Sequence, residues 1–392
     1  RGAAVLGAAL LVLAGGYFFK YSVDHQLISP AMRVVLGVAV GIGCLVGSET
    51  WLRSRHALLA NSLGGTGVAI LYLAFWAALA RYQLISTTVA ALLMILVTAA
   101  ACVLCVYRRS LVLALFALAG GFATPIMLST GSDRPIALFS YLLLLDVALL
   151  VVARQRGWTV LTALSLLASA FYQGYWILTL MGPDRLLLGM GIALAFAALF
   201  VFGPREPQGP ATAAPLWTIR IAGMFLPFLF ALYFGARAEL TPHWYETGAF
   251  TLLLVAGALW VGWRQGAVGL GAGAACAALG VQGAWLLTHR LAAGSSWEVV
   301  GFLILLGMLT QAAAELQRWR PVAPTGEADP AVAVALLGGL IVSSLSAASA
   351  GDGVPWPWLA CSAALGALGL RAGSFAGRAW LELAAPAGVS LG

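Results

Sequence analysis

Long apolar runs separated by short polar turns make up most of the hydropathy pattern. Runs of about 18 or more apolar residues recur along the chain, each long enough to cross about 30 Å of hydrocarbon as a helix. Fourteen runs are centred near residues 11, 43, 69, 95, 119, 144, 168, 195, 225, 256, 277, 307, 339 and 362. A further run at 375–389 is short and contains Pro386, which is typical of an interfacial or re-entrant end. The pattern predicts an all-α, polytopic transmembrane helical bundle of about 14 spans.

Composition agrees with a membrane protein. Of the 392 residues, 62% are hydrophobic and 9% charged, whereas about 25% of residues are charged in a soluble domain. No stretch remains for a soluble domain. The five cysteines lie within or at the edges of apolar runs, so we expect no disulfide framework. The pair in "CVLC" at 102–105 is interpreted as small packing residues.

The charge pattern predicts the orientation. Fourteen of the 21 basic residues fall on one side of the predicted membrane, namely Arg1, Arg53, Arg55, Arg108, Arg109, Arg154, Arg156, Arg205, Arg220, Arg264, Arg318, Arg320, Arg371 and Arg378. By the positive-inside rule this side, with the N-terminus, is cytoplasmic. The arginines never form a clustered face, which excludes nucleic acid as a partner despite the net charge of +7.

Short repeated motifs suggest internal repetition. "LAGGY" at 13–17, "LGGTG" at 63–67 and "LAGGF" at 118–122 place a glycine pair in the first, third and fifth spans. "QLIS" occurs at 26–29 and again at 83–86, each time just before an inward-running span. These matches favour a repeated two-helix hairpin, as in many transporters, although chance matches are common in a chain rich in Ala, Gly and Leu.

Catalytic and cofactor motifs are missing. The sequence contains no Walker loop, G-x-S-x-G, H-E-x-x-H or dinucleotide fingerprint. "HWYE" at 243–246 has the spacing for a His and a Glu to share a metal, but no second ligand pair accompanies it. We therefore predict no catalytic residues, no metal site and no cofactor, and an enzymatic role is the less favoured reading.

Asp146 is the most costly residue for a membrane span. It lies near the middle of the sixth span, where a charged carboxylate costs about 2.5 to 3.5 kcal/mol on the insertion scale. One reading makes Asp146 a coupling carboxylate or substrate anchor. The other makes it a hydrogen-bonded group that fastens one helix to another. Glu49, near a span end, is explained by a local i, i+4 pair with Arg53.

The stretch "LAGGFATPIMLSTGSDRP" at 118–135 predicts an irregular fifth span. Gly120 and Gly121 permit close helix approach. Pro125 leaves a carbonyl near position 121 unpaired, for Thr124 or a water to satisfy. We expect a broken or kinked helix, which either exposes carbonyls to a substrate or bends the span around a neighbour.

Two further groups complete the candidate sites. In "FYQGYW" at 171–176, Tyr172 and Gln173 either line a path for a sugar or lipid, together with Tyr141, or belong to an aromatic belt. Lys20, Tyr21 and Arg33 meet at the predicted outer interface, where they bind an anionic group or simply anchor the helices.

A family resemblance follows from three segments: "FFKYSVDHQLISPAMRVVLG" (18–37), "LGGTGVAILYLAFWAALARYQLIS" (63–86) and "LALFALAGGFATPIMLSTGSDRPIALFSYLLLLDVALLVVARQRGW" (113–158). In this order they resemble bacterial multi-pass membrane proteins of the domain of unknown function 2339 family. The likeness gives a family-like block at 1–158 with spans 1–6, and a further helical block at 159–392 with spans 7–14 and the short terminal segment.

The resemblance implies a bacterial inner-membrane protein, often preceded by a cytoplasmic coiled-coil-like region that would lie outside this sequence, and no known activity. It also implies an amide where this chain has Asp146, which weakens a proton-coupling role. The matching positions are Lys20, Tyr21, Pro30, Arg33, Gly64, Gly65, Gly67, Tyr72, Tyr82, Gly120, Gly121, Phe122, Thr124, Pro125, Tyr141 and Trp158.

Three functions remain open from the sequence. The first is a transporter or a flippase for lipid-linked precursors, with a path near spans one to seven. The second is a non-catalytic scaffold or assembly subunit that binds membrane lipids and a protein partner in the envelope. The third is a membrane enzyme acting on lipid-linked sugars, which needs Asp24, His25, His243 and Glu246 to meet on the outer face.

Overall fold

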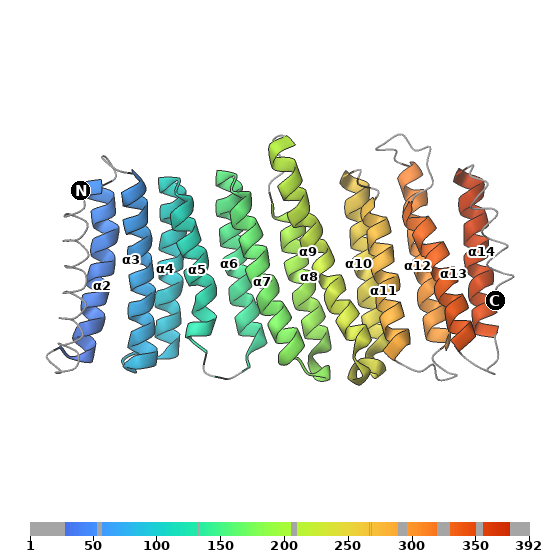
Figure 1. Ribbon diagram of the computed structural model, residues 1–392, viewed down its shortest axis with the longest axis horizontal. Helices are drawn as coiled ribbons and strands as arrows, with labels where there is room; N and C mark the ends of the chain where they lie inside the picture. Colours follow the sequence, from blue (N-terminus) through green and yellow to red (C-terminus); the bar gives the residue numbers. More distant parts are fainter. Residues whose placement is uncertain are drawn as a thin grey trace, which may run out of the picture. The chain divides into compact units, whose positions relative to one another are not determined.

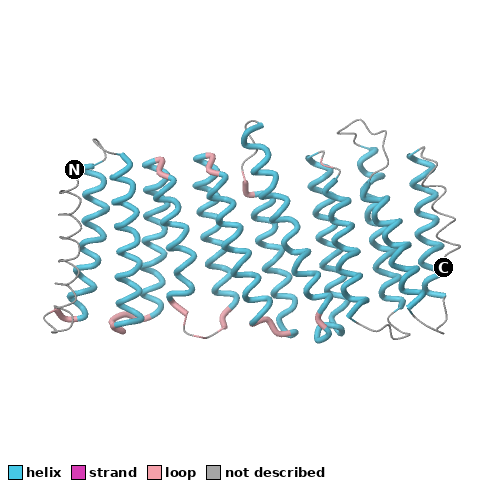
Figure 2. Tube along the Cα trace, in the orientation of Figure 1, coloured by secondary structure: helices cyan, strands magenta, loops and turns pink. Residues whose placement is uncertain are grey.

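The structure is a computed structural model that describes residues 28–52, 57–129, 131, 133–204, 210–265, 267, 269–288, 296–319, 330–349 and 356–376. Within these ranges helices are joined by short loops and no strand is present (Figure 2). The predicted all-α membrane bundle is therefore confirmed. The first predicted span, near residue 11, lies outside the described residues.

The chain divides into two compact units. Unit 1 comprises Arg1–Ser169 with Pro204–Ala213, and unit 2 comprises Ala170–Gly203 with Ala214–Gly392. The boundary falls inside helix α7, Thr159–Thr179, so the two halves of this helix belong to different units. The division at 158, which rested on the family resemblance, stays a prediction.

Helices of unit 1 alternate in direction, as short loops between spans require (Figure 1). They are α2 Pro30–Gly47, α3 Ala57–Trp76, α4 Thr87–Arg108, α5 Leu111–Met127, α6 Pro135–Arg156 and the first half of α7, with π-helical turns at Ser48–Leu52 and Ala77–Arg81. α2 packs on α3, and α5 packs on both α3 and α4. In this unit, helices that follow each other in the chain, such as α2 and α3 or α4 and α5, therefore pack against each other.

The two "QLIS" copies have a structural role in common. Each ends on the N-cap serine of the helix that follows: Ser29 accepts a hydrogen bond from the backbone N–H of Met32, and Ser86 accepts one from that of Val89. A serine at this position satisfies a backbone donor that the first helical turn leaves unpaired. The repeated motif therefore marks the starts of α2 and α4.

Unit 2 contains the second half of α7 and a longer series of helices. They are α8 Leu186–Phe202, α9 Pro210–Ala236, α10 Trp244–Gln265, α11 Gly269–Thr288, α12 Ser296–Trp319, α13 Pro330–Ser349 and α14 Trp356–Ala376, with 3₁₀ turns at Pro183–Arg185 and Ala238–His243. α11 packs on α10 and α13, and α14 packs on α12 and α13. These contacts build one apolar core from α10 to α14.

Thirteen of the fourteen predicted spans fall in the described part of the chain. In the described part of the chain there are thirteen α-helices, and each covers one of the predicted centres. Ten of them are long and apolar enough to cross a membrane, whereas the apolar stretches Leu111–Met127, Ala331–Ser344 and Leu359–Arg371 are shorter. Within the described residues the structure therefore supports ten to thirteen spans, and the predicted span near residue 11 stays a prediction.

Candidate functional site

Asp146 lies near the middle of α6, and its side chain is 0% exposed. Ser165 donates a hydrogen bond to its Oδ1 atom and Ser169 donates one to its Oδ2 atom. The two serines are four residues apart on α7, a spacing that puts both hydroxyls on one helix face. Among the described residues, no basic side chain forms an ion pair with this carboxyl group. Both of its oxygens therefore join α6 to α7.

Pro125 lies in the last turn of α5, and the helix continues through it to Met127. Because proline has no N–H, the carbonyl of Gly121 loses its helical partner. The Tyr141 hydroxyl of α6 donates to this carbonyl at 2.8 Å, and the Thr124 hydroxyl donates to the carbonyl of Gly120, also at 2.8 Å. The Gly121 carbonyl thus lacks a backbone partner, as predicted. Its hydrogen bond comes from Tyr141 of the next helix. Of the two expected forms of this span, the broken helix is wrong, because α5 is continuous through Pro125, and the kinked helix stays a prediction.

A second buried contact joins α3 to α4. The Thr98 hydroxyl donates its one hydrogen to the carbonyl of Met94 at 2.8 Å, so the Tyr72 hydroxyl, 2.5 Å away, must donate to Thr98. A Cβ atom at Gly120 would collide with the Tyr72 ring. Glycine at this position therefore lets the aromatic ring of α3 lie directly against α5.

The polar side chains of α3 to α6 form what we call the hydroxyl cluster: Tyr72, Thr98, Thr124 and Tyr141. Tyr141 interacts with both threonines in addition to its bond with the Gly121 carbonyl. Tyr72, Thr98 and Thr124 are all buried. Four helices of unit 1 are thus tied together by hydroxyl groups and backbone carbonyls, without a charged residue.

The candidate path residues do not form a single site. Gly120, Gly121, Thr124, Pro125 and Tyr141 belong to the hydroxyl cluster or border it. Asp146 follows Tyr141 by five residues, which places the two side chains about 140° apart around α6. Their contacts accordingly lead to different helices, those of Tyr141 to α4 and α5 and those of Asp146 to α7.

Tyr172 and Gln173 lie in the half of α7 that belongs to unit 2. The Gln173 side chain is buried, and the half-buried Tyr172 ring meets that of Phe171 edge to face at 6.2 Å. In the same segment Trp176 is buried and Tyr175 is exposed. The exposed Tyr175 ring fits a position in an aromatic belt, and a path along Tyr172 and Gln173 stays a prediction.

The outer-face anionic group is described only at Arg33, because Lys20 and Tyr21 lie outside the described residues. The Arg33 Nε atom donates to the carbonyl of Ile28 at 2.9 Å, and its guanidinium lies 5.8 Å from the centre of the Tyr82 ring. Arg33 therefore connects the start of α2 with the turn that precedes α4. Binding of an anion there stays a prediction.

Sequence reasoning missed the most strongly bonded charge in unit 1. Arg108, the last residue of α4, has a side chain only 3% exposed. Its Nη2 atom lies 2.6 Å from the Glu49 carboxylate, and its Nη1 atom donates to the Ser48 hydroxyl at 2.9 Å. A Cβ atom at Gly64 would lie 2.8 Å from Nη1, so this glycine leaves room for the guanidinium to pass α3.

Arg156 repeats this arrangement one hairpin later. It is the last residue of α6, and its Nη2 atom donates to the carbonyl of Val106 near the end of α4. Similarly, the Nη2 atom of Arg108 approaches the carbonyl of Leu45 near the end of α2 at 3.5 Å. Carbonyls in the last turn of a helix lack internal partners, and cations there are favoured by the helix dipole. Arg108 and Arg156 were assigned to orientation alone, but their position as the last residue of a helix was a usable signal.

On the opposite side of the predicted membrane, His243 and Glu246 do meet, with 3.3 Å between Nδ1 and Oε1. Asp24 and His25 lie outside the described residues. Among the residues that the structure describes, no group of three potential metal ligands is found. Of the constellation that a membrane enzyme would need, the described part of the chain therefore contains this one pair, and the rest stays a prediction.

A model for a family of predicted membrane proteins, DUF2339, matches residues 1–389. The chain belongs to this family. The match is not confined to 15–158, where the quoted motifs lie, but continues through unit 2. No curated protein and no solved structure matches the chain. This DUF2339 protein is thus a multi-pass membrane protein, and the family description names no activity.

Proposed function

We propose that this protein is a structural or assembly subunit of the bacterial inner membrane, whose helices support a protein partner in the envelope. The observation that carries the proposal is the engagement of both Asp146 oxygens by serines of the adjacent helix, with no exposed side-chain surface. A polar group buried in a span needs an internal partner or a water-filled cavity. Here the partner is internal.

The other polar residues of unit 1 support the same function. The hydroxyl cluster and Arg108 each connect one helix to another, as ties that hold a fixed bundle do. Serine hydroxyls both donate and accept hydrogen bonds, so the tie at Asp146 does not depend on a negative charge.

We therefore expect Asp146→Asn to change the free energy of unfolding by less than about 0.5 kcal/mol, because the amide keeps two hydrogen-bonding atoms toward α7. Reversible unfolding in mixed detergent micelles measures the change. Asp146→Leu, which has no hydrogen-bonding atom, is the matched control and is expected to cost more. A large loss in Asp146→Asn would mean that the carboxylate itself is needed.

The second candidate is a transporter or a flippase for lipid-linked precursors. The favouring observation is the same carboxyl group, because an ionisable residue at mid-span is by default a candidate functional residue. The two functions differ in one measurable property. A transport path must bring water to Asp146 in some state of the protein, and a scaffold keeps it dry.

Cysteine accessibility in native membranes separates the two functions. Ser165→Cys places a thiol against Asp146, in a background whose five native cysteines are replaced by alanine. We expect no reaction with a small water-soluble thiol reagent added to either side. Reaction from either side would refute the scaffold function. Ser169→Cys repeats the test while keeping the Ser165 bond.

Two control positions make a negative result informative. Leu167→Cys, on the exposed face of the same helix, should react only with a lipid-soluble reagent. Asp133→Cys, in the exposed loop before α6, should react with a water-soluble reagent from the outside alone. Labelling of Asp133→Cys from the cytoplasmic side would reverse the proposed orientation, in which the N-terminus is cytoplasmic.

A further inference from the structure

Two neighbouring helices of unit 1 end in the same way at the predicted cytoplasmic side. α4 ends with Arg108, and Arg109 follows it in the left-handed region, at φ 53°. α6 ends with Arg156, and Gly157 follows it in the same region, at φ 72°. Glycine adopts this conformation without steric strain and is the common residue after a helix. The turn after α4 therefore has an arginine where its counterpart has a glycine.

The fold itself does not require an arginine at position 109. The Arg109 side chain is exposed, and among the described residues no acid forms an ion pair with it. Orientation does not require this position either, because the positive-inside rule counts basic residues anywhere within about 15 to 20 residues of a span end. A strained residue that the fold does not use is a candidate for function.

Arg156 lies beside Arg109. Its Nη2 atom donates to the Val106 carbonyl, and the backbone N–H of Arg109 donates to the same oxygen at 3.4 Å. One acceptor therefore holds the guanidinium of Arg156 next to the turn that carries Arg109. A guanidinium has five N–H groups, and within the described part of the chain this is the hydrogen bond that Arg156 donates. Donors thus remain for a ligand on these two residues, which we call the arginine pair.

No carboxylate balances the arginine pair. The sequence has no Asp or Glu at 104–115 or at 150–162, and Glu49, at the end of α2, pairs with Arg108. Two cations at adjoining helix ends create a positive potential that attracts an anion. Arginine offers a planar fork of donors, whose geometry matches the oxygens of a phosphate. The chemistry of the pair therefore favours a phosphate group.

The arginine pair lies at the depth of the lipid headgroups. α4 and α6 are candidate membrane spans that end at Arg108 and Arg156. Exposed Tyr107 precedes the one end, and half-buried Trp158 follows the other. Tyr and Trp collect at the interface between hydrocarbon and water, and basic sites between spans on the cytoplasmic side bind phosphate-bearing headgroups. The phosphate present at this depth is that of a membrane lipid.

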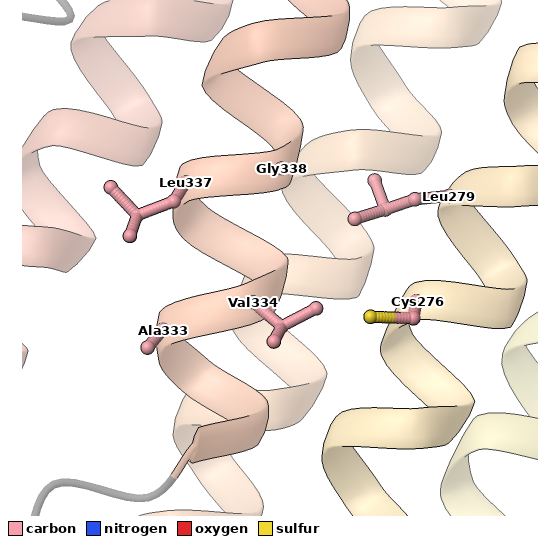
Figure 3. Close-up of a pocket in the computed structure, with 6 residues that line it drawn as sticks. All are labelled: Cys276, Leu279, Ala333, Val334, Leu337 and Gly338. Carbon is pink, nitrogen blue, oxygen red and sulfur yellow. The ribbon is translucent and has the colours of Figure 1, made fainter.

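The open groove in unit 2 offers no comparable selection. It lies between α11 and α13 and has a volume of about 390 Å³. Cys276, Leu279 and the other residues that line it carry no charge (Figure 3). Nothing in this groove distinguishes one lipid headgroup from another.

We propose that the arginine pair binds the phosphate of an anionic phospholipid at the cytoplasmic ends of α4 and α6. A headgroup with a net negative charge is preferred, because the two arginines repel the cationic group of a zwitterionic headgroup. The contact needs only a lipid of the surrounding membrane. It is independent of the scaffold function, since a scaffold, a transporter and a flippase would all accommodate it.

Native mass spectrometry of the full chain in detergent tests the proposal with added phosphatidylglycerol and phosphatidylcholine. We expect phosphatidylglycerol to bind several-fold more tightly. Arg109→Gly should lower its affinity several-fold and leave the unfolding midpoint unchanged or higher, because glycine suits the left-handed turn. Arg264→Gln removes the same charge from an exposed position near the end of α10 in unit 2 and should leave the affinity unchanged. Equal losses in the two variants would mean diffuse attraction and would overturn the proposal.

Photo-crosslinking of the unaltered protein needs no variant. The probe is a phosphatidylglycerol with a diazirine beside its phosphate, present as a minor lipid in phosphatidylcholine vesicles. We expect cross-links on 107–109 and 154–158 to exceed those on 260–265, at the end of α10, several-fold. Equal labelling of these helix ends would mean that only the general lipid shell is present. Suppression by millimolar inorganic phosphate would mean that the pair serves a soluble phosphate compound. Either result would refute a lipid site.

Discussion

Several buried hydroxyl groups bond differently in the two units. In unit 1 they connect different helices, as Tyr72 does with Thr98 and Tyr141 with the Gly121 carbonyl. In unit 2 the buried hydroxyls of Thr251 and Thr310 donate to carbonyls of their own helices. Its helices are instead joined by close packing, with the Trp244 ring 4.8 Å from that of Trp285. These side chains therefore bond between helices in unit 1, whereas in unit 2 they bond within one helix or pack ring against ring.

The difference extends to the ion pairs at the predicted cytoplasmic ends. Arg108 of unit 1 is buried, whereas Arg371 of unit 2 is 58% exposed in its pair with Glu315, although their Nε and Oε1 atoms are only 2.9 Å apart. Both pairs join a helix to the next one that runs in the same direction. The two Arg–Glu pairs are therefore expected to contribute unequally to stability, because water screens the exposed pair.

The largest effect is expected for Arg108→Met. The change removes a buried guanidinium that binds both Glu49 and the Ser48 hydroxyl, and should lower the free energy of unfolding by about 3 kcal/mol, because each hydrogen bond to a charged group contributes about 1.5 to 3 kcal/mol. Arg371→Met is the matched control and should cost about 0.5 kcal/mol, since exposed ion pairs contribute little. Reversible unfolding in detergent micelles measures both changes. Equal losses would remove the distinction between the units.

Gly120→Ala tests the close approach of α3 to α5. The added methyl group overlaps the Tyr72 ring, and overpacking of this kind costs about 1 to 3 kcal/mol. Gly43→Ala on α2, where a Cβ atom meets nothing within 4 Å, should be neutral or slightly stabilising. Thermal unfolding midpoints compare the two variants. Tolerance of Gly120→Ala would show that the ring moves aside freely.

Gln282→Leu should raise the free energy of unfolding, in contrast to the two preceding variants. This α11 residue of unit 2 is 0% exposed, and neither atom of its amide has a hydrogen-bond partner among the described residues. Replacing such a group by an apolar side chain is expected to stabilise the protein by about 1 kcal/mol. Gln311→Leu is the control and should destabilise, because the Gln311 amide donates to Glu315 at 3.2 Å. Loss of stability in Gln282→Leu would indicate a polar function for unit 2.

The smallest effect is expected for Tyr141→Phe, which removes the bond to the Gly121 carbonyl. Interhelical hydrogen bonds in membrane proteins average about 0.6 kcal/mol. Thr310→Val in unit 2 removes only bonds to its own helix and should be close to neutral. If the unfolding free energies of the two variants agree, the hydroxyl cluster contributes no specific stability.

Hydropathy predicted the helices well, because crossing hydrocarbon requires long apolar segments whatever their partners are. It could not predict which side chains meet. Asp146 was recognised as costly from its position alone, yet its serines lie on another helix. Glu49 was paired with Arg53, four residues away. Arg53 lies outside the described residues, so that pair stays a prediction, and the structure adds a bond from Glu49 to Arg108, about sixty residues further along. Local spacing carries no information on such contacts.

The Asp146 tie also bears on how the protein enters the membrane during synthesis. As α6 leaves the ribosome alone, its central acid opposes insertion by about 2.5 to 3.5 kcal/mol. The two serines that receive it follow only 19 and 23 residues later. We therefore expect the translocon to retain α6 until α7 arrives and to release the two helices as a pair. The chain would then enter the bilayer with its most polar group already enclosed.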